Sequence, residues 1–300
     1  MAARFAPSDK ARAFLADPAN RITWDFNAEE LPAMRASDRA EAEKRAPRLA
    51  EQHGVTLGWQ DIAGVPSLLI TPEKRCGDDQ VLYLFGGSFI MGGPLEDLVI
   101  SATLAGQSDM QVISPAYALA PEAPFPAGLN DVLKVARHVQ PRAVVGESAG
   151  GNFALSVARQ LVDDGAGIAA LALLSPAADM SPAFDPDDAA DDPTLYPPLV
   201  ATMPGIYAPE TDPFDDRLSP LYGNFGPDWP PCLITTGTRD RFAGPCARLA
   251  RAMREAGAEV DLRLWDGMWH VFEYYEGIPE SAASLREIAA FLSAHCRTER

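Results

Sequence analysis

The sequence contains few cysteines, and they lie far apart. Four occur in 300 residues, and no two of them form a C-x-x-C pair. Zinc sites and the disulfide frameworks of small domains both show closer or paired spacings. The spacing therefore predicts free structural thiols, with no metal bound through them, at Cys76, Cys232, Cys246 and Cys296.

Long apolar runs are absent as well. The chain has no uninterrupted apolar stretch of about 18 residues, the length that a membrane-spanning helix needs. Residues 1–20 also lack the apolar run of a signal peptide. We therefore expect a cytoplasmic protein without a membrane partner.

Basic residues are outnumbered by acidic ones. The chain has 25 Lys and Arg against 42 Asp and Glu, which gives a net charge of −17 at pH 7. Such a charge repels phosphate backbones, and no basic segment offsets it locally, so nucleic acid is not an expected partner. The share of hydrophobic residues, 47%, is typical of a globular chain with one sizeable core.

The order of helix-like and strand-like segments predicts an α/β fold. Residues 1–52 are expected to be helical, because apolar residues there are spaced among charges. After residue 53, short apolar runs alternate with helix-like segments, which is typical of a mostly parallel sheet with helices on both faces. The expected strands are 55–60, 66–70, 80–85, 111–114, 143–145, 168–174, 232–236 and 259–265, and the later helices are 128–139, 148–162, 243–256 and 280–294.

Between residues 178 and 229 this alternation stops. The segment is crowded with Asp and Pro, above all in residues 185–193, and it is too long for a simple connection. We interpret it as an insertion with short helices of its own. Its acidic run is interpreted as a solvated loop rather than a metal site, since the spacing does not match an EF-hand loop.

The segment around Ser148 predicts a nucleophile. Residues 146–150 read GESAG, a G-x-S-x-G pattern between an expected strand and an expected helix. A serine on a sharp strand-to-helix turn needs small neighbours, which Gly146 and Gly150 supply, because side chains there would clash with the crossing backbone. The helix N-terminus and the N–H of Ala149 favour negative charge beside such a serine.

A serine hydroxyl needs a base, which is usually histidine. Only four histidines occur in the chain. His53 and His138 end expected helices, and His295 lies near the C-terminus. His270 instead follows the strand 259–265 across a short loop, where the active sites of parallel sheets gather. His270 is therefore the predicted base.

The imidazole in turn needs a carboxylate that fixes its tautomer and stabilises its charged form. Asp240 follows the strand 232–236 and gives the chain order Ser, Asp, His that is typical of one large class of serine hydrolases. Asp266, on the loop of the histidine itself, is the second candidate. We predict that Asp240 orients His270.

A glycine pair, Gly86 and Gly87, follows the buried strand 80–85. Backbone N–H groups in such a turn could bind the oxyanion that forms when a serine attacks a carbonyl group. On its own the pair is equally compatible with a plain structural turn.

Taken together, these segments resemble the hormone-sensitive-lipase-like family of α/β-hydrolases, which includes many short-acyl carboxylesterases. The resemblance runs in order over most of residues 80–275. Residues 146–152 (GESAGGN) are similar to the family's G-D-S-A-G-G-N, and residues 117–126 (YALAPEAPFP) to its Y-R-L-A-P-E-H-P-F-P. Residues 236–240 (TGTRD) and 267–270 (GMWH) are similar to its acid and histidine loops.

The resemblance implies an α/β-hydrolase fold and the hydrolysis of small carboxylic esters or lactones through an acyl-enzyme intermediate. It implies no cofactor and no metal, and it leaves a homodimer open. The implied catalytic triad is Ser148, Asp240 and His270, and the implied oxyanion donors are the N–H groups of Gly87, Ser88 and Ala149.

The resemblance also implies a helical cap over the catalytic domain 53–300. Residues 1–52 would form its N-terminal part and residues 178–229 would be inserted into the catalytic domain. Candidate linings of the acyl pocket, with plain core packing as the alternative, are Phe5, Phe14, Trp24, Phe26, Ile206 and Tyr207.

The chain departs from the family pattern at several positions. Phe85 replaces the histidine of the family's H-G-G-G, and Ser88 replaces its last glycine. Glu147 replaces the usual Asp beside the nucleophile, while Ala118 and Ala123 replace an Arg and a His. If position 88 needs a left-handed backbone, a serine there costs roughly 1–2 kcal/mol. These departures concern the oxyanion loop and the preferred substrate.

Two other functions stay open at this point. The missing histidine at Phe85 is compatible with a ligand-binding pseudo-hydrolase that has lost its chemistry. A peptidase or an acyltransferase could use the same triad. Because the order of Ser148, Asp240 and His270 is intact, we predict a carboxylic ester hydrolase.

Overall fold

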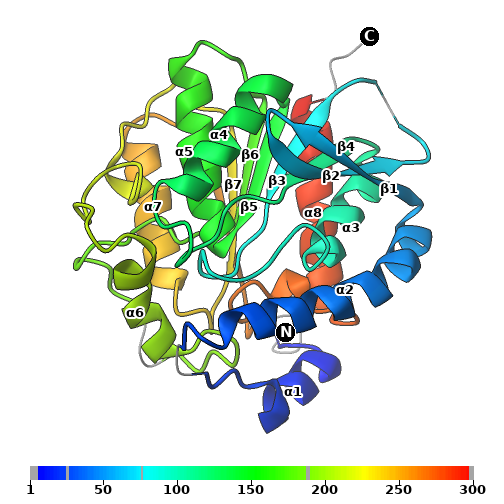
Figure 1. Ribbon diagram of the computed structural model, residues 1–300, viewed down its shortest axis with the longest axis vertical. Helices are drawn as coiled ribbons and strands as arrows, with labels where there is room; N and C mark the ends of the chain where they lie inside the picture. The colour runs from blue at the N-terminus through cyan, green and yellow to red at the C-terminus, as the bar shows by residue number, and fades with distance from the viewer. Residues whose placement is uncertain (1–5, 25–26, 76, 187–189, 297–300) are drawn as a thin grey trace.

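The computed structural model describes residues 6–24, 27–75, 77–186 and 190–296. Within these ranges the chain forms one 8-stranded sheet in the order β1-β2-β4-β3-β5-β6-β7-β8 (Figure 1). β1 and β2 form an antiparallel hairpin, β2 is also antiparallel to β4, and all other neighbours are parallel. The predicted mostly parallel sheet is thus confirmed. The strands are β1 (Val55–Ile62), β2 (Val65–Pro72), β3 (Gln80–Leu84), β4 (Gln111–Pro115), β5 (Ala143–Glu147), β6 (Ala170–Leu174), β7 (Cys232–Gly237) and β8 (Val260–Trp265).

Helices cover both faces of the sheet, as Figure 1 shows. One face carries α4 (Ala127–Val139), α5 (Ser148–Asp163) and α7 (Ala243–Glu255), and the other carries α3 (Leu98–Ser108) and α8 (Pro279–Cys296). Every residue of the central strands β5, β6 and β7 is buried. Strands buried on both faces consist of apolar runs, which explains why the sequence revealed them.

Helix α3 was not predicted. It contains almost only apolar and small residues, and nine of its 11 residues are buried against β2, β4, α8 and α2 (Leu31–His53). A helix that is apolar all round has no polar face, so the spacing of its hydrophobic residues does not distinguish it from a strand.

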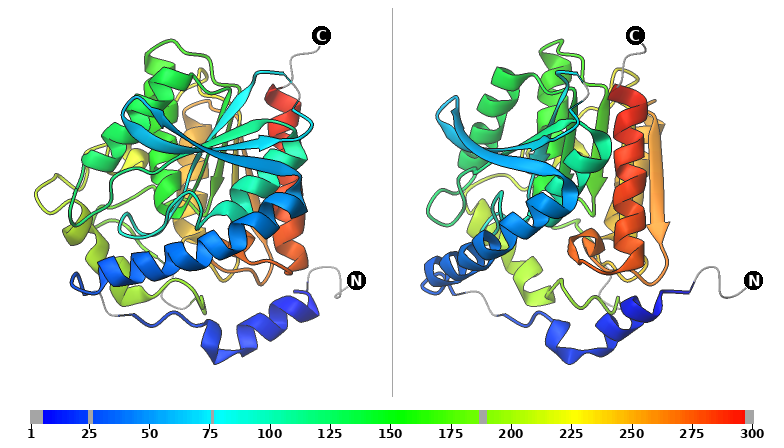
Figure 2. Two further views of the ribbon diagram at one scale, coloured as in Figure 1. Left: turned by 45° about the vertical axis from the view of Figure 1, so that its right-hand side comes forward. Right: turned by 90° about the vertical axis from the view of Figure 1, so that its right-hand side faces the viewer.

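The end of the sheet to which the parallel strands point is covered by three helices. These are α1 (Asp9–Ala16), α2, and α6 (Pro197–Tyr207) from the segment 178–229, and Figure 2 shows them together at the lower end of both views. None of the helices that the structure describes has the length and apolar composition needed to cross a membrane. Short 3₁₀ helices lie at Pro18–Asn20, Pro220–Tyr222 and Phe272–Tyr274.

The N-terminal segment and the segment 178–229 are bonded to each other. The N–H of Ile22 donates to the carbonyl of Pro193 at 2.8 Å. Asp191 pairs with Arg21 at 2.5 Å and with Arg239 at 3.1 Å. These contacts join two parts of the chain that are distant in sequence above one end of the sheet.

Asn152 on α5 anchors the segment 178–229 near both of its ends. Its side-chain amide donates to the carbonyl of Ala177 at 2.8 Å and to that of Leu218 at 2.9 Å. The side chain is fully buried, so water cannot replace these bonds. A buried carbonyl that loses its donor costs about 1–3 kcal/mol.

We expect Asn152→Ala to lower the free energy of unfolding by about 3 kcal/mol, because two buried carbonyls lose their donor. Chemical denaturation measures this change. Ser156→Ala on the same helix is the control, since its buried hydroxyl has no hydrogen-bond partner among the described residues, and it should change stability by less than about 0.5 kcal/mol. Equal stabilities of the two variants would contradict the anchoring role.

Candidate active site

Ser148 lies on a sharp turn between β5 and α5. Its φ angle is +50°, in the left-handed region. A Cβ atom on Gly146 would lie 2.2 Å from the carbonyl oxygen of Gly150, and one on Gly150 would lie 2.0 Å from that of Leu84. Both positions therefore require glycine. The turn holds the serine hydroxyl above the carboxyl edge of the sheet.

A line of hydrogen bonds runs from Ser148 through His270 to Asp240. The serine Oγ lies 2.9 Å from Nε2 of the imidazole, and Nδ1 lies 3.0 Å from Oδ1 of the aspartate. In the tautomer protonated at Nδ1, the imidazole donates to Asp240 and accepts from Ser148. The structure thus brings together the three residues expected from distant segments. Asp266, the second candidate for the acid, is exposed.

Asp240 is held by two further donors. The N–H of Phe242 donates to its Oδ1 at 2.8 Å, and the hydroxyl of Thr236 donates to its Oδ2 at 2.7 Å. Burial by itself would raise the pKa of Asp240, but the charge and hydrogen bond of His270, followed by the hydrogen bonds of Ser175 and of the Phe242 N–H, lower it below its usual value. The carboxylate therefore stays ionised beside the imidazole.

The same charge acts on His270 in the opposite direction. Burial by itself would lower the pKa of the imidazole, whereas the carboxylate of Asp240, followed by Asp192 and Glu273, raises it above its usual value. An imidazole with a raised pKa is a stronger base toward a hydroxyl proton.

Asp192 is a site residue that the sequence analysis missed. It lies in the acidic run that we expected to be solvated, yet it is buried, and its Oδ2 accepts the N–H of His270 at 3.1 Å. Its Oδ1 accepts the N–H groups of Thr194 and Leu195 at 2.9 and 3.1 Å. The solvated-loop interpretation is thus wrong for this residue, because three backbone donors replace its hydration.

The backbone beside His270 is constrained as well. Val271 has a φ of +46°, which is unfavourable for a β-branched residue. Its N–H donates to the hydroxyl of Ser175 at 3.3 Å, and the hydroxyl of Thr194 donates to the carbonyl of His270 at 3.3 Å. These bonds fix the loop that aims the imidazole at Ser148.

The loop after β3 lies beside the serine. Ser88 has a φ of +55°. Position 88 therefore does adopt the left-handed backbone, which is unfavourable for a serine. Ser88 and Ala149 line one small cavity together with Ser148. A Cβ on Gly87 would lie 2.4 Å from the carbonyl oxygen of Met91, which requires glycine there. Each of the three residues expected to bind an oxyanion thus lines a cavity that Ser148 also lines.

Phe85, in place of the family's histidine, is buried and stacks on Tyr117. The ring centroids are 4.1 Å apart, and the hydroxyl of Tyr117 donates to the carbonyl of Phe85 at 2.5 Å. An aromatic stack and a backbone hydrogen bond thus support the loop at the position where the family has an imidazole.

Glu147 and Asp97 form a buried carboxyl pair next to the nucleophile. Burial and the mutual proximity of the two groups raise the pKa of Glu147 well above its usual value, and burial raises the pKa of Asp97 to about 6. The hydroxyl of Tyr83 donates to Asp97 at 2.5 Å, and Glu147 accepts the N–H of Gly86. The pair therefore retains a proton above the usual carboxyl pKa and holds the start of the loop after β3.

A cavity of about 540 Å³ opens over Ser148 and His270. Trp24, one of the candidate linings of the acyl pocket, is among the residues that line this cavity. Phe14 instead stacks on Trp269 with ring centroids 4.3 Å apart, and Tyr207 stacks on Phe89 at 3.9 Å. Ile206 packs against the main core. Phe5 and Phe26 lie outside the described residues.

In the described ranges no group of three or more His, Cys, Asp or Glu side chains could hold a metal ion. Cys232, Cys246 and Cys296 are buried free thiols, and Cys76 lies outside the described residues. Burial raises the pKa of Cys246 well above its usual value, so this thiol is not a nucleophile at neutral pH.

Comparisons with known proteins give consistent results. Residues 81–274 match the family model Abhydrolase_3, described as an alpha/beta hydrolase fold. The chain is 28% identical to a putative acetyl-hydrolase, LipR, of Mycobacterium tuberculosis, over 84% of this chain and 83% of that protein. It is 29% identical to an acetyl-hydrolase of Streptomyces hygroscopicus, over 74% and 78% of the two chains. A crystal structure of a hormone-sensitive lipase from a metagenome library superposes with a TM-score of 0.86 at 29% identity, covering 97% of this chain and 100% of that one.

The carboxyl pair makes stability depend on pH. A carboxyl group with a higher pKa in the folded than in the unfolded state binds protons on folding, so stability falls as pH rises between the two values. We expect the free energy of unfolding of the wild type to fall between about pH 5 and pH 8, and to fall less in Glu147→Gln, which cannot ionise. Denaturation at both pH values measures the difference.

Glu122→Gln is the matched control, because Glu122 is little buried, and its bonds to its own backbone and to Arg35 lower its pKa despite that partial burial. That carboxyl group is already ionised at the lower pH, so its removal should leave the pH dependence unchanged. If the free energy of unfolding depends equally on pH in the wild type and in Glu147→Gln, the conclusion that Glu147 and Asp97 retain a proton is contradicted.

Proposed function

Because the chain belongs to the Abhydrolase_3 family of alpha/beta hydrolases, we propose that it is a carboxylic ester hydrolase that uses Ser148 as its nucleophile. The predicted resemblance to hormone-sensitive-lipase-like esterases is confirmed by the family match and by its relatives. The unbroken line of hydrogen bonds from Ser148 to Asp240 is the single observation that carries this proposal.

In the proposed first step, His270 removes the proton of Ser148 as the serine oxygen attacks the ester carbonyl. The carbonyl oxygen gains a negative charge, which the N–H groups of Gly87, Ser88 and Ala149 bind. Asp240 stabilises the imidazolium. His270 then gives its proton to the alcohol oxygen, the C–O bond breaks, and the acyl group remains on Ser148.

The second step repeats the first with water. His270 takes a proton from water, the resulting hydroxide attacks the acyl carbonyl, and the bond to the Ser148 oxygen breaks as the proton returns to the serine. The carboxylic acid is released. No cofactor takes part in this scheme, because the imidazole provides every proton transfer.

We propose small esters or lactones as substrates. The sizes of the cavities next to Ser148 support this proposal, and so do the relatives that are named acetyl-hydrolases. The proposed cap consists of residues 1–52 and 178–229 above the catalytic domain 53–300. Its support is that both segments line the cavity over Ser148, for example through Trp24 and Leu199. The cytoplasmic location and the homodimer stay predictions.

We expect Ser148→Ala to lower the hydrolysis of p-nitrophenyl acetate by at least about 10⁴-fold, because the alanine has no nucleophilic oxygen. The release of p-nitrophenol measures the rate. Ser156→Ala, on the same helix, should keep the wild-type rate. A rate within tenfold of wild type in Ser148→Ala would contradict the proposed nucleophile.

The raised pKa of His270 predicts the pH profile. The base acts only when neutral, so kcat/KM rises with pH, and its midpoint should lie above about 6.5, the ordinary histidine value. Asp240→Asn removes the charge that raises the pKa, so the midpoint should move down while the rate falls about 10⁴-fold. A midpoint at or below 6.5 in the wild type would contradict the proposed roles of His270 and Asp240.

A further inference from the structure

Two cavities meet at Ser148, and only one of them is also lined by His270. The cavity of about 540 Å³ is lined by Ser148 and His270. The second cavity, of about 50 Å³, is lined by Ser148, Ser88 and Ala149 but not by the histidine. Both cavities therefore reach Ser148, but only the larger one also borders the imidazole.

This difference indicates which cavity takes the alcohol group of an ester and which takes the acyl group. The alcohol oxygen receives its proton from His270, so the alcohol group must lie on the side of the imidazole, in the larger cavity. The acyl group then points away from the imidazole, past Ser88 and Ala149, into the cavity of 50 Å³. We call this smaller space the inner acyl cavity.

The inner acyl cavity is small. A water-sized group needs about 10–15 Å³ of such volume, so 50 Å³ holds roughly four non-hydrogen atoms. An acetyl to butyryl chain fits within this space. A longer chain needs a continuation.

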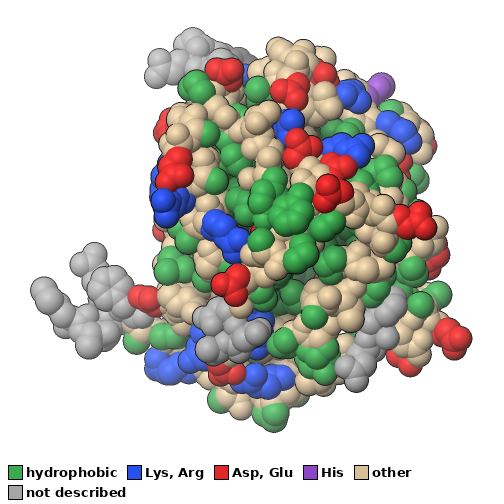
Figure 3. All heavy atoms as spheres, turned by 90° about the vertical axis from the view of Figure 1, so that its left-hand side faces the viewer, with side chains coloured by type: hydrophobic (Ala, Val, Ile, Leu, Met, Phe, Trp, Pro, Cys, Tyr) green, Lys and Arg blue, Asp and Glu red, His purple; other side chains and the backbone are tan. Residues whose placement is uncertain are grey.

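A third cavity of about 730 Å³ lies on the other side of one layer of side chains. We call it the outer cavity; it opens on the face that Figure 3 shows, where hydrophobic side chains gather near the middle. The same side chains line the outer cavity and the inner acyl cavity, so the wall between them is one side chain thick. These wall residues are Met180, Ser181, Phe184, Val200 and Pro204.

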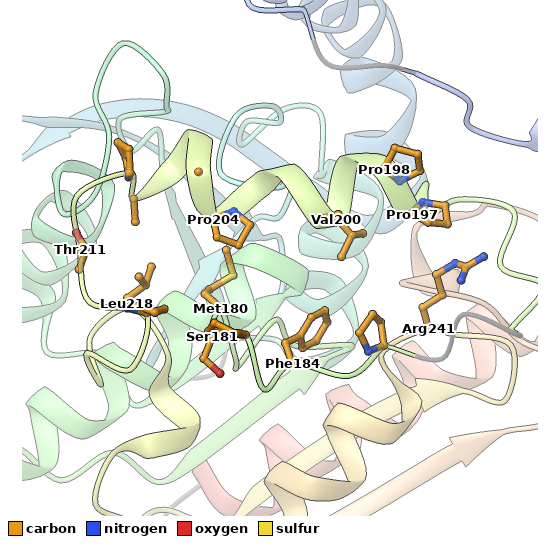
Figure 4. Close-up of a pocket in the computed structure, with 17 residues that line it drawn as sticks. Met180, Ser181, Phe184, Pro197, Pro198, Val200, Pro204, Thr211, Leu218 and Arg241 are labelled. Carbon is orange, nitrogen blue, oxygen red and sulfur yellow. The ribbon is translucent and has the colours of Figure 1, made fainter.

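Figure 4 shows how the wall is built. Val200 and Pro204 project from α6 toward the segment below it, where Phe184 and Met180 face them. Val200, Phe184 and Pro204 are only half-buried, whereas Met180 is buried. Because these residues border both cavities, we expect the loss of a few side-chain atoms here to join them.

The charged residue at the inner acyl cavity does not disturb an apolar occupant. Asp179 lines this cavity, but its side chain is almost fully buried and its oxygens are bonded. They accept the N–H of Ser181 at 2.9 Å, the hydroxyl of Tyr222 at 3.3 Å and the guanidinium of Arg248 at 3.4 Å. The wall includes the polar Ser181, whose hydroxyl lies 2.8 Å from that of Tyr222, and its other residues are apolar.

We propose that the wall made by Met180, Ser181, Phe184, Val200 and Pro204 sets the acyl length, because it closes the inner acyl cavity and separates it from the outer cavity. The wild-type wall admits acetyl to butyryl groups, and a narrower residue at position 200 admits a tail into the outer cavity. This inference rests on the proposed ester hydrolysis at Ser148.

The test compares kcat/KM for p-nitrophenyl acetate, butyrate and octanoate. Val200→Ala should raise the octanoate-to-acetate ratio at least about tenfold over wild type, as expected when further methylene groups enter an apolar site. Leu199→Ala is the matched control. Leu199 also lies on α6 but lines the larger cavity, to which the alcohol group is assigned, so this truncation should leave the octanoate-to-acetate ratio unchanged.

A second substitution fills the outer cavity. Ala201 is exposed and lines the outer cavity but not the inner acyl cavity. In the double variant Val200→Ala and Ala201→Phe, the gain on octanoate should disappear while acetate turnover persists. Acetate turnover in each variant also verifies that the variant is folded.

The outcomes separate this inference from the proposed function. An unchanged ratio in Val200→Ala, or a gain that survives Ala201→Phe, overturns the acyl-length wall even though acetate is hydrolysed. A wild-type chain that hydrolyses none of the three esters overturns the proposed function itself. An equal gain in Leu199→Ala also overturns the wall, because the change would then be unspecific.

Discussion

The hydrogen-bonded line from Ser148 to Asp240 is the constraint on which the rest of the structure depends. It joins residues that follow β5, β7 and β8, strands that are parallel and close in the sheet. Because parallel strands end at the same edge, three loops distant in sequence reach one point. The alternation of strands and helices thus places one imidazole 2.9 Å from the serine hydroxyl and 3.0 Å from the carboxylate.

The segment 178–229 supports this line as well as covering it. Asp192 holds the backbone of His270, and Asn152 ties the segment to the helix that carries the serine. The segment also provides the wall that separates the inner acyl cavity from the outer cavity. The same insertion therefore positions the proposed base and limits the acyl group.

Much of this arrangement could be predicted from the sequence. The central strands β5, β6 and β7 were visible because each is a short, fully buried and mostly apolar run. Gly146 and Gly150 are required beside Ser148, because a Cβ atom at these positions would lie 2.2 and 2.0 Å from a carbonyl oxygen. Helix α3 was missed, because a helix that is apolar on every side has no periodic pattern. Asp192 was missed for a different reason: a buried acidic residue in an acidic run looks like its exposed neighbours, and only the fold shows its three backbone donors.

The most direct test of the central claim is to label the protein with a fluorophosphonate and to identify the modified residue by peptide mass spectrometry. Only a serine oxygen activated by a neighbouring base attacks this reagent readily. The predicted result is a single phosphonyl group on the peptide that contains Ser148, formed as hydrolysis of the ester is lost. Labelling at another residue, or full ester hydrolysis after complete labelling of Ser148, would contradict the account.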